Sequence, residues 1–127
     1  MGNRILLVDD STLMRKKLAD ILTGGGFAIA GEATNGREGV ARYRELAPDL
    51  VTMDIMMPLL SGIDATREIV AGAPAARIVL CCALGQEGQA LEAIEAGALD
   101  FIAKPFEAED VLFIVRRALA PAALARP

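Results

Sequence analysis

The feature that most constrains the fold is a regular alternation of two hydrophobic patterns along the chain. Five short apolar runs are suited to buried strands, and they lie at residues 4–8, 27–32, 49–53, 77–82 and 99–103. Each run is followed by a stretch in which apolar residues recur at helical spacing. Strands that are apolar almost throughout are typical of a parallel sheet covered by helices on both faces. The alternation predicts one α/β domain.

Capping residues set the boundaries of the predicted helices. Ser11 stands where the first helix begins, and the glycines at 24–26 and at Gly97 stand where the first and fourth helices end. The apolar face of the fourth helix is expected to carry Leu91 and Ile94. We expect a single domain over residues 1–127, with a core at about 3–119 and a short C-terminal tail.

The glycine clusters do not predict a nucleotide-binding loop. A phosphate-binding loop follows the first strand and opens a helix, whereas the glycines at 24–26 follow the first helix. Gly36 and Gly39 lie at the start of the second helix and are interpreted in the same way.

Composition excludes several classes of function. The net charge is −4, and the 13 Lys and Arg residues form no dense block, so nucleic acid is not the expected partner. No window approaches the roughly 18 apolar residues of a membrane span, and no targeting segment is visible, so a cytoplasmic location is expected. The chain has no histidine, which leaves its chemistry to carboxylates, hydroxyls, thiols and lysine.

Charged residues collect where the predicted strands end. Asp9 and Asp10 end the first strand, and Asp54 ends the third. Cys82 and Lys104 end the fourth and fifth strands. In open α/β sheets ligands bind outside the carboxyl ends of the strands, so these residues are considered together. In a flavodoxin-like, doubly wound sheet of order 2-1-3-4-5 the three carboxylates converge, and the lysine approaches from the far side.

Three crowded carboxylates repel one another unless a cation joins them. Oxygen ligands with room for water favour Mg²⁺, and a metal with a nearby lysine can clamp a transferring phosphoryl group. One carboxylate would be the nucleophile. A single aspartate after a strand is more often a helix N-cap, but the adjacent Asp9 and Asp10 cannot both cap one helix.

Three motifs extend this interpretation to a family. The segments LLVDDS, VTMDIMMPLLSGID and DFIAKPF, in this order and spacing, resemble the receiver domain of two-component response regulators, in particular the stand-alone chemotaxis regulators of the CheY family. The resemblance covers essentially the whole chain. It implies a signalling switch rather than an enzyme. Such a switch accepts a phosphoryl group from a histidine kinase and changes its affinity for a protein target, such as a flagellar motor component. A monomer that binds neither nucleic acid nor membrane is expected.

The resemblance also implies a role for each residue of the site. Asp54 would be phosphorylated. Asp10 and Asp54 would ligate Mg²⁺ together with the backbone carbonyl of Met56, and Asp9 would act mainly through water. Lys104 would pair with Asp54 and later with a phosphoryl oxygen.

Further motif residues are expected to shape the site. The resemblance implies a cis peptide bond before Pro105, although a proline that simply ends the strand is the alternative. Met57, Pro58 and Gly62 would shape the loop beside the acceptor without a direct chemical role.

The two adjacent cysteines require separate interpretations. Cys82 stands where the family usually has a threonine or serine that bonds to the phosphoryl group, so this sequence departs from the pattern. Cys81 is expected to point to the opposite face as a small core residue. A redox role for Cys82, with its thiol pKa lowered by Lys104, is the rival interpretation. Phe101 falls at a second switch position, with static core as its alternative.

Two functions from other classes remain as alternatives. An aspartyl-phosphate phosphohydrolase usually carries its nucleophile in a D-x-D motif after the first strand, which VDDS lacks. A flavodoxin-type electron carrier needs a hydroxyl-rich loop and aromatic walls, whereas the loop here is acidic and the chain has no tryptophan. No output domain is expected after residue 119, so direct protein contact is the expected output.

Overall fold

A computed structural model describes residues 2–124, and in it five strands form one parallel sheet of order β2-β1-β3-β4-β5. The strands are β1 (Arg4–Val8), β2 (Ala28–Ala33), β3 (Leu50–Asp54), β4 (Ile78–Cys82) and β5 (Asp100–Ala103). Each begins within one residue of the apolar run that predicted it. The flavodoxin-like topology is thereby confirmed, and the strand order reverses between β1 and β3.

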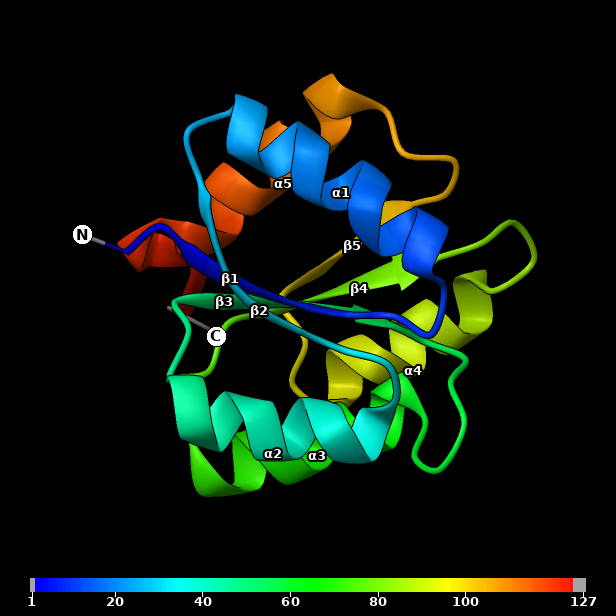
Figure 1. Ribbon diagram of the computed structural model, residues 1–127. Coiled ribbons are helices and arrows are strands. Elements are labelled where there is room, and N and C mark those ends of the chain that lie inside the picture. Colours follow the sequence, from blue (N-terminus) through cyan, green and yellow to red (C-terminus); the bar gives the residue numbers. More distant parts are fainter. Residues whose placement is uncertain (1, 125–127) are drawn as a thin grey trace.

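Helices cover both faces of the sheet. They are α1 (Thr12–Gly24), α2 (Gly36–Leu46), α3 (Gly62–Gly72), α4 (Glu87–Ala96) and α5 (Ala108–Leu119), followed by the short 3₁₀ helix η1 (Pro121–Leu124). Figure 1 shows α1 and α5 on one side of the sheet and α2, α3 and α4 on the other. No helix within residues 2–124 is long and apolar enough to cross a membrane.

The alternation of side chains along the strands divides the interior into two cores. One lies under α2, α3 and α4 and includes Met53, Leu80 and Cys82. The other lies under α1 and α5 and includes Val79 and Cys81. Because successive strand residues point to opposite faces, the adjacent cysteines enter different cores. This confirms the expected orientation of Cys81.

The helix ends agree with the predicted caps. The Ser11 hydroxyl accepts a hydrogen bond from the Met14 N–H at 3.2 Å, at the start of α1. Gly26 and Gly97 have φ values of 93° and 122°, a left-handed region that favours glycine. A Cβ at Gly36 would lie 2.0 Å from the Leu60 carbonyl oxygen, so this glycine permits close packing of two segments.

The predicted buried face of α4 requires a correction. Leu91 is 66% exposed, and the helix instead buries Ala90 and Ala93 against the sheet and α3. Ile94 is half-buried. Small residues on the inner face let the helix approach closely, which turns the stripe that carries Leu91 outward.

Candidate functional site

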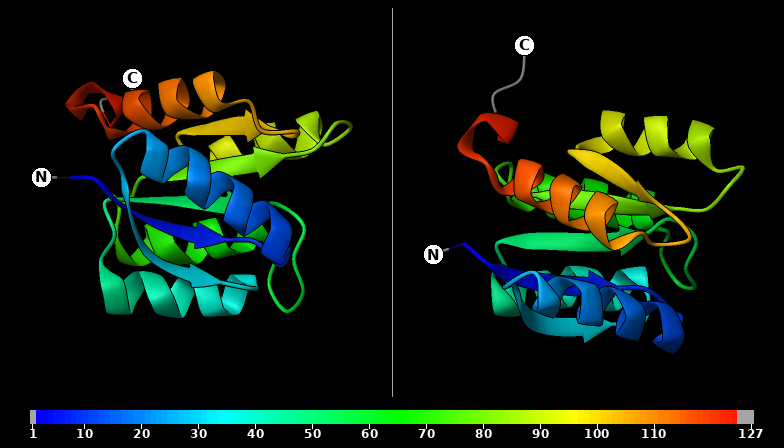
Figure 2. Two further views of the ribbon diagram at one scale, coloured as in Figure 1. Left: turned by 45° about the horizontal axis from the view of Figure 1, so that its top comes forward. Right: turned by 90° about the horizontal axis from the view of Figure 1, so that it is seen from above.

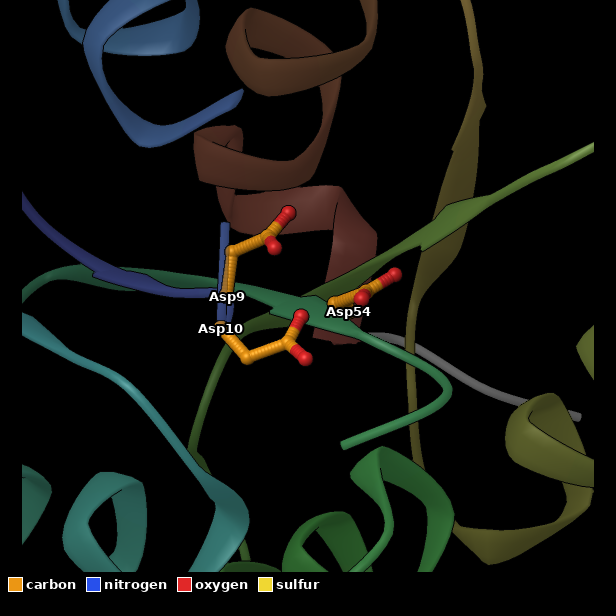
Figure 3. A group of neighbouring side chains, drawn as sticks. All are labelled: Asp9, Asp10 and Asp54. Carbon is orange, nitrogen blue, oxygen red and sulfur yellow. The ribbon is translucent and has the colours of Figure 1, made fainter. Parts of the chain in front are cut away.

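Three carboxylates meet where β1 and β3 end. Val8 pairs with Met53 in the parallel ladder, so Asp9 and Asp54 follow at the same level of neighbouring strands. Asp10 joins them, and carboxylate oxygens of the three residues lie within 4.8 Å of one another (Figure 3). Both views of Figure 2 place the loops that follow β1, β3 and β4 at the same end of the sheet. The predicted convergence is therefore observed.

Lys104 extends from the end of β5 to two of these carboxylates. Its Nζ lies 3.1 Å from Asp54 Oδ1 and 3.3 Å from Asp9 Oδ2. The lysine side chain is 19% exposed, and each carboxylate side chain is 10% exposed. These are short, partly desolvated ion pairs, which solvent screens less than it screens surface pairs.

The charges at this edge are unbalanced. Burial raises the pKa of Asp54, the negative charge of Asp9 raises it further, and Lys104 opposes them only in part. Burial alone would lower the pKa of Lys104, but the charges of Asp54 and Asp9 outweigh it and raise that pKa. One ammonium group cannot neutralise three carboxylates, so the site favours a further cation. Oxygen ligands and an open side suit Mg²⁺, as expected from the sequence.

Asp9 and Asp10 differ in how firmly they are held. Asp9 Oδ1 accepts a hydrogen bond from the Ser11 N–H at 2.8 Å, and the Asp9 N–H donates to the Ala33 carbonyl at 3.1 Å. Asp10 is exposed, and its carboxylate accepts no hydrogen bond from any residue in the 2–124 range. Asp10 is therefore the carboxylate most available to a metal ion, while Asp9 anchors Lys104.

The loop after Asp54 packs tightly against the end of β3. A Cβ at Gly62 would lie 2.0 Å from the Asp54 carbonyl oxygen, and the Gly62 N–H donates to the Ile55 carbonyl at 2.8 Å. Met57 is half-buried and Pro58 is exposed. Leu59 has a φ of 70°, which is strained for a leucine. Met56 is 58% exposed, and its Sδ lies 4.0 Å from Gln89 Nε2 on α4.

The two residues expected to act as switch positions lie on β4 and β5. Cys82 is 4% exposed, and its Sγ lies 3.5 Å from the Ala83 carbonyl oxygen. Its backbone carbonyl accepts a hydrogen bond from the Lys104 N–H at 2.8 Å. Phe101 is 36% exposed on β5. The Lys104–Pro105 peptide bond is cis, as the resemblance implied.

The cysteine thiols are poorly suited to redox chemistry. Burial raises the pKa of both Cys81 and Cys82, nearby carboxylates raise it further, and Lys104 opposes these effects only in part. The thiolate is the reactive form, so this environment disfavours reactivity at neutral pH.

Arg15 contacts the site but was not among the residues predicted from the sequence. It lies on α1, one turn after Ser11, and its side chain is 11% exposed. Its Nη1 donates to the Asp9 carbonyl at 2.6 Å. The only sequence signal was an arginine four residues after a helix N-cap, which by itself does not distinguish a buried contact from an exposed charge.

Similarities to known proteins agree with this geometry. The sequence pattern of the response regulator receiver domain matches residues 5–116. The chain is 55% identical over 112 residues to the chemotaxis protein CheY of Thermotoga maritima, covering 88% of this chain and 93% of that protein. It is 49% identical over 119 residues to the chemotaxis protein CheY of Bacillus subtilis, covering 94% and 99%.

Solved structures show the same architecture. The crystal structure of a CheX–CheY–BeF3–Mg²⁺ complex from Borrelia burgdorferi contains a chain that matches with a TM-score of 0.87 and 35% identity, covering 92% of this chain and 89% of that one. The response regulator domain of Thermotoga maritima CheB matches with a TM-score of 0.82 and 36% identity over the full length of both chains. With its acidic edge and apposed lysine, the chain belongs to the family of response regulator receiver domains.

Proposed function

We propose that this chain is a phosphorylatable switch of a chemotaxis-like two-component system and that Asp54 is its phosphoryl acceptor. The observation that carries the proposal is the position of Asp54, which contacts Lys104 and lies within 4.8 Å of the carboxylates of Asp9 and Asp10. Receiver domains of this family are signalling switches rather than conventional enzymes. A chain without histidine must receive a phosphohistidine phosphoryl group from a separate protein, which fits a histidine kinase as the donor.

The residues of the site divide the reaction between them. An Asp54 carboxylate oxygen attacks phosphorus, the P–N bond to the donor imidazole breaks, and the imidazole nitrogen is left to take up a proton. Lys104, already 3.1 Å from Asp54, is placed to hold a phosphoryl oxygen afterwards. Asp10, Asp54 and the Met56 carbonyl would hold Mg²⁺, with Asp9 acting through water. When bound, Mg²⁺ supplies positive charge to the phosphoryl oxygens.

The switch would act on the surface formed by α4, β5 and α5. Cys82 precedes α4, and Phe101 lies on β5, so both residues adjoin that surface. The partly exposed Phe101 ring and the exposed Leu91 and Phe113 offer apolar contacts to a protein target. A flagellar motor component or another effector is the proposed target, bound by a cytoplasmic monomer whose single domain spans residues 1–127. Nucleic acid and membrane are not proposed partners.

The acceptor is tested by labelling with acetyl phosphate in the presence and absence of Mg²⁺. We expect Mg²⁺-dependent labelling of the wild type, none of Asp54→Asn, and weaker labelling of Asp10→Asn. Asp64→Asn is the control, because Asp64 is an exposed aspartate on α3 that pairs with Arg67. Persistent labelling of Asp54→Asn would refute the assignment.

A further inference from the structure

Arg15 joins three segments of the chain beside the carboxylate cluster. Its Nη1 donates to the Asp9 carbonyl at 2.6 Å, and its Nε lies 2.7 Å from Glu32 Oε1 on β2. Its Nη2 lies 3.3 Å from the Thr12 hydroxyl. The arginine side chain is 11% exposed, whereas that of Glu32 is 50% exposed, so the guanidinium is the inner partner of the pair. A planar guanidinium with several donors can hold acceptors on different elements at once.

The contact with the Asp9 carbonyl bears on both carboxylates that follow β1, those of Asp9 and Asp10. That carbonyl belongs to the planar peptide group that joins Asp9 to Asp10. Holding its oxygen fixes the orientation of this plane, from which both side chains branch. The remaining polar atoms of Asp9 are also held, by Ala33, Ser11 and Lys104.

The orientation of this peptide plane determines the position of the Asp10 side chain more than that of Asp9, because the Asp10 carboxylate has no hydrogen-bond partner within residues 2–124. Its position therefore depends on the backbone that carries it. The guanidinium bond to the Asp9 carbonyl is a contact that restrains that backbone, and the Ser11 N–H bond to Asp9 is another.

We propose that Arg15 is a positioning residue for the cation site, which holds the Asp9–Asp10 peptide so that the two carboxylates face Asp54. The inference rests on the proposed function, because it assumes that this site binds Mg²⁺. Arg15 acts through the backbone and contacts neither the metal nor the phosphoryl group. Glu32 and Thr12 hold the guanidinium in place from β2 and from the first turn of α1.

A positioning role and a simple charge effect predict opposite results. Removing a positive charge near a divalent cation site strengthens metal binding by Coulomb's law. Removing a group that orients the ligands weakens metal binding, by about tenfold for residues that support metal ligands. Arg15→Met is therefore expected to bind Mg²⁺ about tenfold more weakly, although it carries one positive charge fewer.

Arg15→Lys isolates geometry from charge. It keeps the positive charge, but a single ammonium group does not reproduce the fork that spans the Asp9 carbonyl and the Glu32 carboxylate. We expect Mg²⁺ binding weakened by at least several-fold. Lys17→Met is the matched control, because Lys17 is an exposed cation on the same helix. Its loss removes the same charge without touching the loop, and Mg²⁺ binding should not weaken.

The experiment is a MgCl2 titration of the purified chain, followed by the amide NMR signals of residues 8–11 and 54–56. Circular dichroism and urea unfolding of each variant show whether it is folded at the titration temperature. A purely structural Arg15 would lower the free energy of unfolding while the folded variants bound Mg²⁺ as the wild type does, and that result would overturn the inference. Tighter binding by Arg15→Met would also overturn it, in favour of the charge effect.

The proposed function and the positioning role fail in different ways. A wild type that does not bind Mg²⁺ at all would overturn both. A wild type that binds Mg²⁺, together with an Arg15→Lys variant that binds equally well, would overturn the positioning role alone.

Discussion

Gly62 offers a sharp test of how the fold positions Asp54, the proposed phosphoryl acceptor. It is the first residue of α3, and a Cβ added there would lie 2.0 Å from the Asp54 carbonyl oxygen, 2.9 Å from the Asp54 carbonyl carbon and 3.1 Å from the Ile55 Cα. All three are backbone atoms, which cannot rotate away as the end of a side chain can. Gly62→Ala must therefore separate the start of α3 from the end of β3.

The expected cost follows from the contacts that this separation breaks. Overpacking against rigid atoms costs about 3 kcal/mol. The Gly62 N–H bond to the Ile55 carbonyl, 2.8 Å long, would add about 1 kcal/mol if lost. The higher helix propensity of alanine returns about 1 kcal/mol. We expect the free energy of unfolding to fall by about 3 kcal/mol, and labelling of Asp54 to fall as well, because the displaced atoms belong to the acceptor residue.

Urea unfolding followed by circular dichroism measures the first effect, and acetyl phosphate labelling measures the second. The control is Gly88→Ala in α4, where a Cβ meets nothing within 4 Å, and which should gain about 0.5–1 kcal/mol. A Gly62→Ala protein as stable and as readily labelled as the wild type would show that the α3 start can move freely. The close approach would then not be what places the acceptor.

Three further predictions concern the site, and a fourth concerns the end of α2. Without Mg²⁺, folded Asp54 has a raised pKa and holds its proton to higher pH than in the unfolded chain, so stability falls as pH rises through that pKa. In EDTA, the stability of Asp54→Asn relative to the wild type should therefore increase as the pH is raised from 4 to 8, as measured by urea unfolding. A difference in unfolding free energy that stayed constant with pH would contradict this. A thiol is a weak donor, so Cys82→Thr should gain a charge-assisted bond worth about 1.5–3 kcal/mol in the phosphorylated state and increase the effect of a phosphoryl mimic on target binding. Equal gains in affinity under reducing conditions would show that the thiol serves as well. Met56 and Leu84 are exposed and apolar and cannot orient water, so Met56→Asn and Leu84→Glu should shorten the phosphoryl lifetime, measured by loss of label. Ala47 has a φ of 45° at the end of α2, so Ala47→Gly should stabilise the fold by about 0.5–1 kcal/mol, whereas destabilisation would show no strain there.

The sequence was sufficient to predict the sheet and the convergence of the acidic residues. The strands are apolar on both faces, so their runs are conspicuous, and their order follows from the doubly wound topology. Once the strands are ordered, the parallel ladder alone brings the ends of β1 and β3 together. The grouping of Asp9, Asp10 and Asp54 could therefore be predicted without any knowledge of side-chain packing. Lys104 was predictable for the same reason, because its long side chain starts at the end of β5.

Contacts that depend on packing were beyond the sequence. Leu91 and Ala90 are adjacent on α4, and the pattern of apolar residues does not say which stripe faces inward when both contain apolar residues. The structure turns the alanines inward because they permit closer approach. The buried contacts of Arg15 could not be predicted from the sequence either. Its partners include Asp9, just after β1, and Glu32 on β2, and a charged residue on a helix surface is usually solvated.

The two adjacent cysteines point to opposite faces of the sheet. Cys81 points into the core under α1 and α5 and can serve only as packing, whereas Cys82 points into the other core at the end of β4. The Cys82 carbonyl also accepts the Lys104 N–H at 2.8 Å, which ties β4 to the residue that contacts Asp54. This backbone contact between β4 and Lys104 does not depend on the side chain at position 82. If Asp54 is the phosphoryl acceptor, as proposed, the weak donor at Cys82 would loosen the side-chain contact between the phosphoryl group and β4, and the backbone hydrogen bond from Lys104 would remain.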